Sequence, residues 1–161
     1  MRRFFRTLIT FAVLVGPSLL AQSAFGGLQL LNGYSAKQAS AVDALAWTIQ
    51  GKNGLRINFE AGPSEGSWAD PEEQSHYAWY REQTIRGLKV RFALVKAGFR
   101  TQWETADGRR LPPGNILLVT YLLGGEKSSH TANFSAKIAN QDEFADALLM
   151  VTTFNPSKGK F

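Results

Sequence analysis

Cysteine is absent from the 161 residues of this chain. This absence excludes disulfide bonds, thiolate metal sites, cysteine nucleophiles and a cysteine-linked lipid anchor. Histidine is scarce: His76 and His130 are the two in the sequence, and their separation of 54 residues matches no familiar metal-ligand spacing. The sequence also lacks a glycine-rich phosphate loop and a dinucleotide fingerprint. We therefore predict no metal and no cofactor.

The sequence also lacks an apolar run that would span a bilayer comfortably. The stretch from Leu8 to Leu20 is shorter than the roughly 20 residues that a spanning helix needs. Three arginines precede it within the first six residues, and small residues follow it, which is typical of a secretory signal. We predict a signal peptide over residues 1–23, with cleavage after Ser23, or alternatively after Ala21 or Ala24. The protein is then secreted or periplasmic, and an uncleaved membrane anchor is the minor alternative.

The positive charge of the chain lies largely in this leader. The whole chain has a net charge of +5 and a pI of about 9.7. Cleavage after residue 23 removes three of the 18 basic residues and no acidic one, which leaves 15 against 13, or +2. We therefore do not expect a nucleic-acid partner. Residues 40–80 carry six acids and two bases, whereas residues 81–110 carry eight bases and three acids. These segments either attract each other in the fold or form a basic face for an anionic partner.

The mature chain has the size of one domain. We predict a lead-in segment over residues 24–40, a single β-rich domain over 41–155 and a flexible tail over 156–161. The domain contains no recognisable internal repeat.

The clearest local element is a hairpin over residues 45–60. Apolar and polar residues alternate on both sides of the sequence Gly51-Lys-Asn-Gly54. A three-residue loop pairs Ile49 with Ile57 and Trp47 with Phe59, which puts the apolar residues on one face. Such a loop needs a left-handed residue at its third position, and Gly54 supplies it.

Other segments predict one helix and further strands. Asp70, Pro71 and Glu73 are typical of a helix start, so we predict a helix over residues 71–85, with a strand over 76–81 as the competing interpretation. Residues 88–94 and 99–105 are expected to form a hairpin. In this hairpin Phe92 should pair with Trp103 and Leu94 with Thr101, and Arg91 should lie opposite Glu104. A strand covered on both faces is predicted over residues 115–123, and another strand over 130–138. A last strand is predicted over 145–154, and its alternative is a helix from residue 141.

These elements together predict a mainly β fold. We expect an antiparallel sandwich or strongly curved sheet of about seven strands, with one helix near residues 71–85. The alternative is an α+β arrangement in which a helix packs on a cup-shaped sheet.

Two patterns suggest catalysis. The first is Gly62-Pro-Ser64-Glu-Gly66, which matches the G-x-S-x-G of serine hydrolases, although a helix should follow that serine directly. The second is a cluster of acids that could supply a glycosidase-like pair: Glu60, Glu65, Asp70, Glu72 and Glu73. A small secreted hydrolase using Ser64 or these acids is our alternative hypothesis.

An aromatic run suggests binding instead. Tyrosine and tryptophan give large contact areas with one polar end, as in sugar or peptide recognition. Packing of these rings against the sheet is the alternative explanation. Our leading hypothesis is an exported, non-enzymatic binding domain, whose partner is an envelope polysaccharide, an anionic lipid surface or another exported protein. A membrane-surface role would use Lys89, Arg91, Arg109 and Arg110. The candidate ligand-binding residues are Trp68, His76, Tyr77, Trp79, Tyr80 and Arg81.

Overall fold

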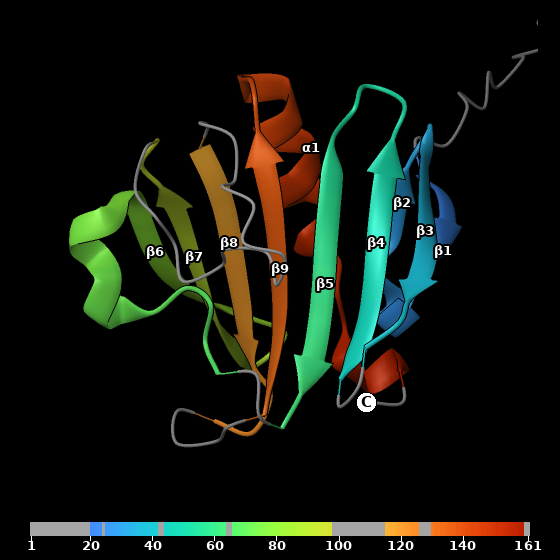
Figure 1. Cartoon of the computed structure of the whole chain (residues 1–161). Helices are drawn as coiled ribbons and strands as arrows, with labels where there is room; N and C mark the ends of the chain where they lie inside the picture. The colour runs from blue at the N-terminus through green and yellow to red at the C-terminus, as the bar shows by residue number, and fades with distance from the viewer. Residues whose placement is uncertain are drawn as a thin grey trace, which may run out of the picture.

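A computed structural model of the chain describes residues 20–23, 25–41, 44–63, 66–97, 115–125 and 130–159. It contains an open seven-stranded antiparallel sheet, a separate two-stranded sheet and one α-helix (Figure 1). The mainly β prediction is therefore confirmed. No helix in the described ranges is long and apolar enough to cross a membrane. With η denoting a 3-10 helix, the elements are β1 (Leu20–Ser23), η1 (Phe25–Gly27), β2 (Gln29–Leu31), β3 (Tyr34–Ala39), β4 (Leu45–Gly51), β5 (Arg56–Gly62), η2 (Pro71–His76), β6 (Tyr77–Ile85), β7 (Leu88–Val95), β8 (Asn115–Leu122), β9 (Thr131–Ile138), α1 (Gln141–Val151) and η3 (Pro156–Lys158).

The large sheet joins two meanders. Its strand order is β3-β4-β5-β9-β8-β7-β6, so β5 pairs with β9, and β3 and β6 form the edges. Because β6 follows β5 in sequence, the chain must cross from the middle of the sheet to its far edge (Figure 1). We call the crossing segment, residues 66–76, the strap. It lies on the face opposite α1.

The β4–β5 hairpin has the predicted register. Ile49 pairs with Ile57, and Trp47 pairs with Phe59. The Gly51 N–H donates to the Leu55 carbonyl at 2.9 Å, which closes a three-residue loop. Gly54 has a φ of +93°, the conformation for which the loop position was expected to need glycine. The alternating pattern and one glycine were sufficient to define this element.

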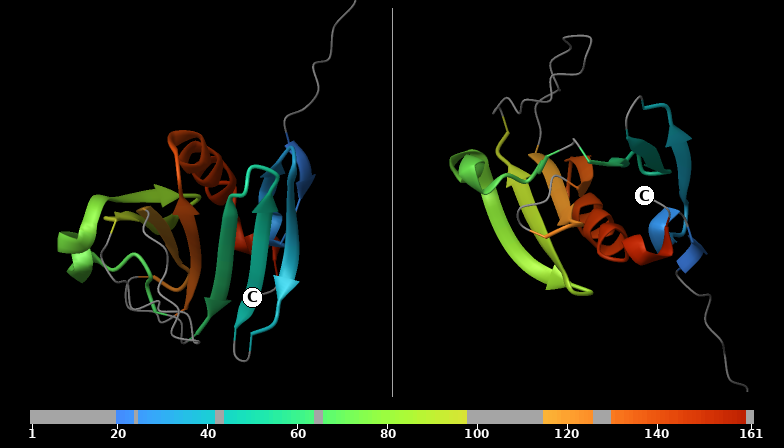
Figure 2. Two further views of the ribbon diagram at one scale, coloured as in Figure 1. Left: turned by 45° about the horizontal axis from the view of Figure 1, so that its top comes forward. Right: turned by 90° about the horizontal axis from the view of Figure 1, so that it is seen from below.

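The main core lies between the sheet and the elements that cover its first face. Figure 2 shows the sheet bent, with the edge strands β6 and β3 on either side of α1. Phe59 and Phe134 pack at 4.8 Å between ring centroids, and Phe154 from the C-terminal segment contacts both. Leu28 and Leu30 from the β2 region are also fully buried here. The segments predicted as lead-in and flexible tail thus contribute β2, β3 and η3 to the structure.

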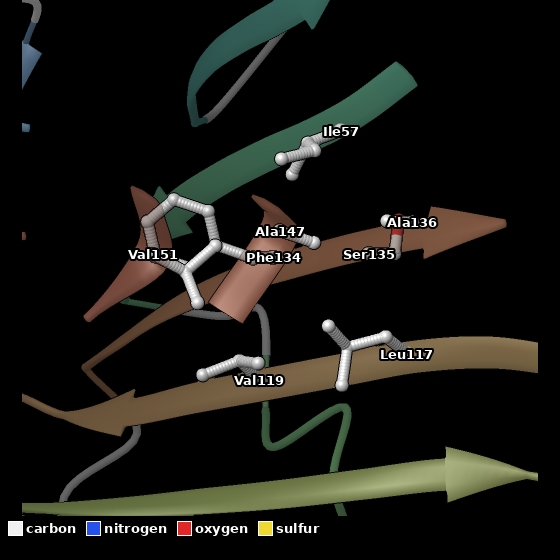
Figure 3. A pocket seen from close by; sticks show the side chains of 8 residues that line it. All are labelled: Ile57, Leu117, Val119, Phe134, Ser135, Ala136, Ala147 and Val151. Atoms are coloured by element: carbon white, nitrogen blue, oxygen red, sulfur yellow. The ribbon is translucent and has the colours of Figure 1, made fainter. Parts of the chain in front are cut away.

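The space beneath α1 is filled by side chains. Figure 3 shows apolar groups from β5, β8, β9 and α1 directed into it. They leave no room for a water molecule. A bent sheet that carries a helix could have enclosed a ligand cavity, but this region is packed core.

The predicted helix over residues 71–85 is wrong. Its start signal is real, because the Asp70 carboxylate accepts a hydrogen bond from the Glu72 N–H at 2.9 Å and Pro71 begins η2. The 3-10 helix ends at residue 76, however, and β6 follows it. The β-forming residues of 77–85 pair along the whole length of β7. A two-residue turn, in which Arg86 and Gly87 both have positive φ, joins the two strands.

The predicted strand over residues 145–154 is also wrong. Residues 141–151 form α1 instead, which agrees with the alternative prediction of a helix from residue 141. The Asn140 side chain accepts a hydrogen bond from the Glu143 N–H at 2.9 Å, and the Glu143 carboxylate accepts one from the Ala139 N–H at 2.8 Å. Met150 and Val151 are buried against the sheet.

The predicted pairing of residues 88–94 with 99–105 is wrong as well. β7 lies between β6 and β8, so Phe92 pairs with Arg81 on one side and Val119 on the other. Neither edge of β7 is free. Arg91 lies opposite Glu82 rather than Glu104. Trp103, Thr101 and Glu104 lie outside the described residues.

The two remaining strands agree with the prediction in position. β8 is central and covered on both faces, since Val119 belongs to the main core and Leu118 to a second cluster beneath the strap. In β9, Phe134 faces the main core, and Asn133 points to the opposite face of the sheet. A polar residue on that face of an alternating strand usually meets solvent, yet Asn133 is fully buried under the strap.

Candidate functional site

The six predicted ligand-binding residues do not form one surface. Four of them lie on β6, where alternate side chains point to opposite faces, whereas Trp68 and His76 belong to the strap that precedes it. A bulge between Tyr77 and Trp79 keeps Tyr77 and Tyr80 on the strap face, where their rings stack at 5.8 Å. Trp79 points to the other face and meets Phe144 of α1 at 6.0 Å, edge to face.

Trp68 and Tyr77 belong to the second core, not to the surface. Trp68 is 7% exposed and Tyr77 is 6% exposed. Burial raises the pKa of Tyr77 to about 12, and the nearby Glu73 charge adds to the shift. His76 and Tyr80 are partly buried, and Arg81 is exposed on the edge strand. The other buried members of this cluster are Ala69, Ala93, Val95 and Leu118.

Buried hydrogen bonds fasten the strap to the sheet. The Asn133 amide accepts from the Trp68 N–H at 3.2 Å and donates to the Gly66 carbonyl at 3.0 Å. The Thr120 hydroxyl donates to the Asn133 amide oxygen at 2.7 Å and accepts from the Trp68 N–H at 3.1 Å. Thr131 donates to the Gly66 carbonyl at 2.7 Å. These polar groups of β8 and β9 are therefore structural. Asn133 also begins the sequence Asn-Phe-Ser, which matches a glycosylation sequon, but its side chain is fully buried in the folded chain.

The basic residues of β7 are already engaged. Lys89 and Arg91 contact the two carboxylate oxygens of Glu82 at 2.8 and 3.1 Å. The hydrogen bonds from Lys89 and Tyr80 lower the pKa of Glu82, and burial together with Glu82 raises the pKa of Tyr80. The charges that suggested membrane binding are thus partly neutralised on β7. Arg109 and Arg110 lie outside the described residues.

The structure assembles no catalytic group from the predicted candidates within the residues it describes. Ser64 and Glu65 are not among these residues. The segment after residue 65 is the extended strap, and a helical turn begins only at Pro71, so the strand-to-helix context of a nucleophilic serine is missing. Asp70 caps η2, while Glu60 lies on β5, separated from β6 by three strands. The described ranges hold no group of three or more metal-binding side chains.

A hollow of about 370 Å³ lies where β5 ends and β9 begins. Glycine, alanine, proline and other uncharged residues make up most of its lining, and His130 is the titratable residue among them. One histidine in such a setting supports no particular chemistry. The lining residues are Ala61, Gly62, Pro63, Leu123, Gly124, His130, Thr131, Pro156 and Gly159.

An open groove over β3, β4 and β5 is the better candidate. It has a volume of about 550 Å³ and lies on the sheet face opposite α1, beyond the strap. The strand register fixes its floor: Lys37, Thr48 and Asn58 form one row across the strands. Ser35, Gln50 and Arg56 form the next row. The lining residues are Ser35, Lys37, Gln38, Ala39, Ser40, Thr48, Gln50 and Arg56.

The cations of this face are available for a partner. Within the described parts of the chain, the side chains of Lys37, Arg56 and Lys137 make no hydrogen bond or ion pair. Arg56 and Lys137 are exposed. Glu60 is the acid that shares this face of β5, and it lies two pairs along the strand from Arg56, beside Asn133.

Sequence reasoning missed this groove. Thr48, Gln50 and Arg56 are polar positions of the two strands that were predicted, but the residues between Ser35 and Ser40 come from the segment that was predicted as a lead-in. The alternation predicts that the first three face solvent, but the assembly of the groove depends on β3 pairing with β4 and on β9 pairing with β5.

Searches for matching family models, curated proteins and solved structures found none.

Proposed function

We propose that the protein is an exported, non-enzymatic binding domain whose groove over β3, β4 and β5 holds an envelope polysaccharide. The observation that carries this proposal is the contrast between the two faces. The space beneath α1 between β5, β8 and β9 has no room for a water molecule, whereas the groove is open and polar.

The chemistry of the groove suits a hydroxyl-rich chain. Serine and threonine hydroxyls and glutamine amides both donate and accept hydrogen bonds, as sugar hydroxyls do. A drug-sized apolar ligand would instead favour an enclosed, mainly hydrophobic pocket. The groove lies next to β3, an edge strand, so a polymer could extend past it without meeting the rest of the sheet.

Export follows from the leader, which we propose is cleaved after Ser23. Cleavage at this position affects the small sheet, because residues 20–23 form β1 and pair with β2. Cleavage removes β1 but no strand of the large sheet, so the groove remains whole.

The test is polysaccharide binding by the chain that lacks residues 1–23. The double variant Thr48→Val/Gln50→Met keeps side-chain volume and removes two hydrogen-bonding groups. At about 0.5–1.5 kcal/mol per hydrogen bond, it should bind roughly tenfold more weakly in calorimetry. Thr84→Val, an exposed position on β6, is the matched control and should bind as the unmodified chain does. Failure of the unmodified chain to bind any polysaccharide in a panel of neutral and acidic polymers would contradict the proposal.

A further inference from the structure

We infer that the ligand of this groove is an acidic polysaccharide, and that Lys137 extends the site from β5 onto β9. This inference rests on the proposed function and specifies its ligand.

The first observation is a pair of like charges. Ile57 pairs with Ala136, and both face the main core. One position beyond this last pair of the β5–β9 ladder, Arg56 and Lys137 lie on the opposite face of their strands, and both are exposed. Neighbouring side chains in this arrangement have Cβ atoms about 5 Å apart, and like charges there are destabilising. A bound anion between them would reverse that repulsion.

The second observation is the surroundings of this pair. Gln50 lies beside Arg56 on β4, and Ile116 lies beside Lys137 on β8. Neither neighbour is acidic. Glu60 lies beside Asn133, four residues from Arg56 along β5, which corresponds to about 13 Å of strand. The described part of this face therefore offers its cations no nearby carboxylate.

The third observation is the spacing to Lys37. Two strand intervals separate β3 from β5, or about 10 Å across the sheet. Lys37 stands in the row of Thr48 and Asn58, and Arg56 stands in the next row. A chain that crosses the strands would meet Lys37 at one end, hydroxyl and amide groups in the middle, and the Arg56–Lys137 pair at the other end. This pattern fits acidic groups separated by neutral hydroxylated units.

An anionic membrane is the competing partner, and the surface disfavours it. Stable attachment to a membrane combines basic charge with apolar groups that enter the interface. The exposed large apolar residue in the described ranges is Leu149, which belongs to α1 on the other side of the sheet. The groove presents polar side chains and alanine.

The experiment compares three probes against single variants of the chain lacking residues 1–23. The probes are polygalacturonate, neutral dextran, and vesicles of phosphatidylglycerol mixed with phosphatidylcholine. The variants are Lys37→Gln, Arg56→Gln and Lys137→Gln, with Lys158→Gln at an exposed position of η3 as the matched control. We expect polygalacturonate to bind most tightly, each of the three variants to weaken it by about three- to tenfold, the control to leave it unchanged, and added salt to weaken it further.

The outcomes separate the two claims. Binding of dextran as tightly as polygalacturonate, with no effect of the three variants, would overturn the acidic ligand while leaving polysaccharide binding intact. Loss of affinity in Lys37→Gln and Arg56→Gln but not in Lys137→Gln would overturn the extension onto β9. Binding of the anionic vesicles alone would overturn both claims and replace them with a membrane-surface role.

Discussion

Asn133 provides the most direct perturbation of the strap. Replacing it with alanine removes four hydrogen bonds, to Trp68, Gly66, Thr131 and Thr120. The Trp68 N–H and the Gly66 carbonyl each keep a second partner, Thr120 and Thr131 respectively. The Thr120 hydroxyl loses its acceptor inside the protein.

The magnitude follows from these losses. One buried donor without a partner costs about 1–3 kcal/mol, and the shared bonds contribute about 1 kcal/mol more. We therefore expect Asn133→Ala to lower the free energy of unfolding by about 2–4 kcal/mol. Urea unfolding followed by fluorescence measures this change, and hydrogen exchange of the Trp68 and Ala69 amides reports the strap itself.

Ser135→Ala is the matched control, because Ser135 lies two residues along β9 on the same face. It should change the stability by less than about 0.5 kcal/mol. A similarly small change in stability for Asn133→Ala, with unaltered hydrogen exchange at Trp68, would refute the conclusion that these hydrogen bonds hold the strap over the second core. Trp68 and Tyr77 would then again be candidates for binding rather than packing.

Three further predictions concern the packing of α1 and the hairpins. Arg86→Ala should lower the free energy of unfolding by about 1.5–3 kcal/mol, because the guanidinium donates to the Thr152 and Phe154 carbonyls beyond α1. Arg86→Gly should lower it by about 1 kcal/mol less, since φ is +50° at this position and glycine adopts a positive φ without strain. Equal losses in the two variants would contradict this account of the turn. Phe134→Ala should lower it by about 3–5 kcal/mol in the same assay, and a loss below about 1 kcal/mol would contradict a filled core. Burial and the hydrogen bond to Asp146 raise the pKa of Tyr34 to about 12, above its usual 10, so the stability that it contributes is full below pH 10 and is lost as the pH rises through 12. A stability profile over this range should be flatter in Tyr34→Phe, and identical profiles would count against the shift.

The local elements of the fold could be predicted from the sequence in part. The β4–β5 hairpin could be predicted with its register, because strict alternation and Gly54 both restrict the same turn. The helix start at Asp70 was also a true signal, but a cap does not determine how far a helix extends. Eight of the nine residues of β6 pair with β7, and this tertiary gain outweighs the preference for a helix.

The candidate site depended on long-range pairing. Arg56 and Lys137 are 81 residues apart in the sequence and become neighbours only because β9 inserts next to β5. The aromatic run looked like a surface because a helix would have grouped its rings on one side. On a strand they divide between two cores, and only the strand order and the bulge determine how.

Nuclear magnetic resonance titration of the chain lacking residues 1–23 with polygalacturonate tests the location of the site most directly. The account predicts that amide shifts concentrate on β3, β4 and β5, at Ser35, Thr48 and Gln50, and extend to Lys137 on β9. Shifts confined to the strap and to β6, around Tyr80 and Arg81, would contradict it and would place binding on the aromatic edge instead.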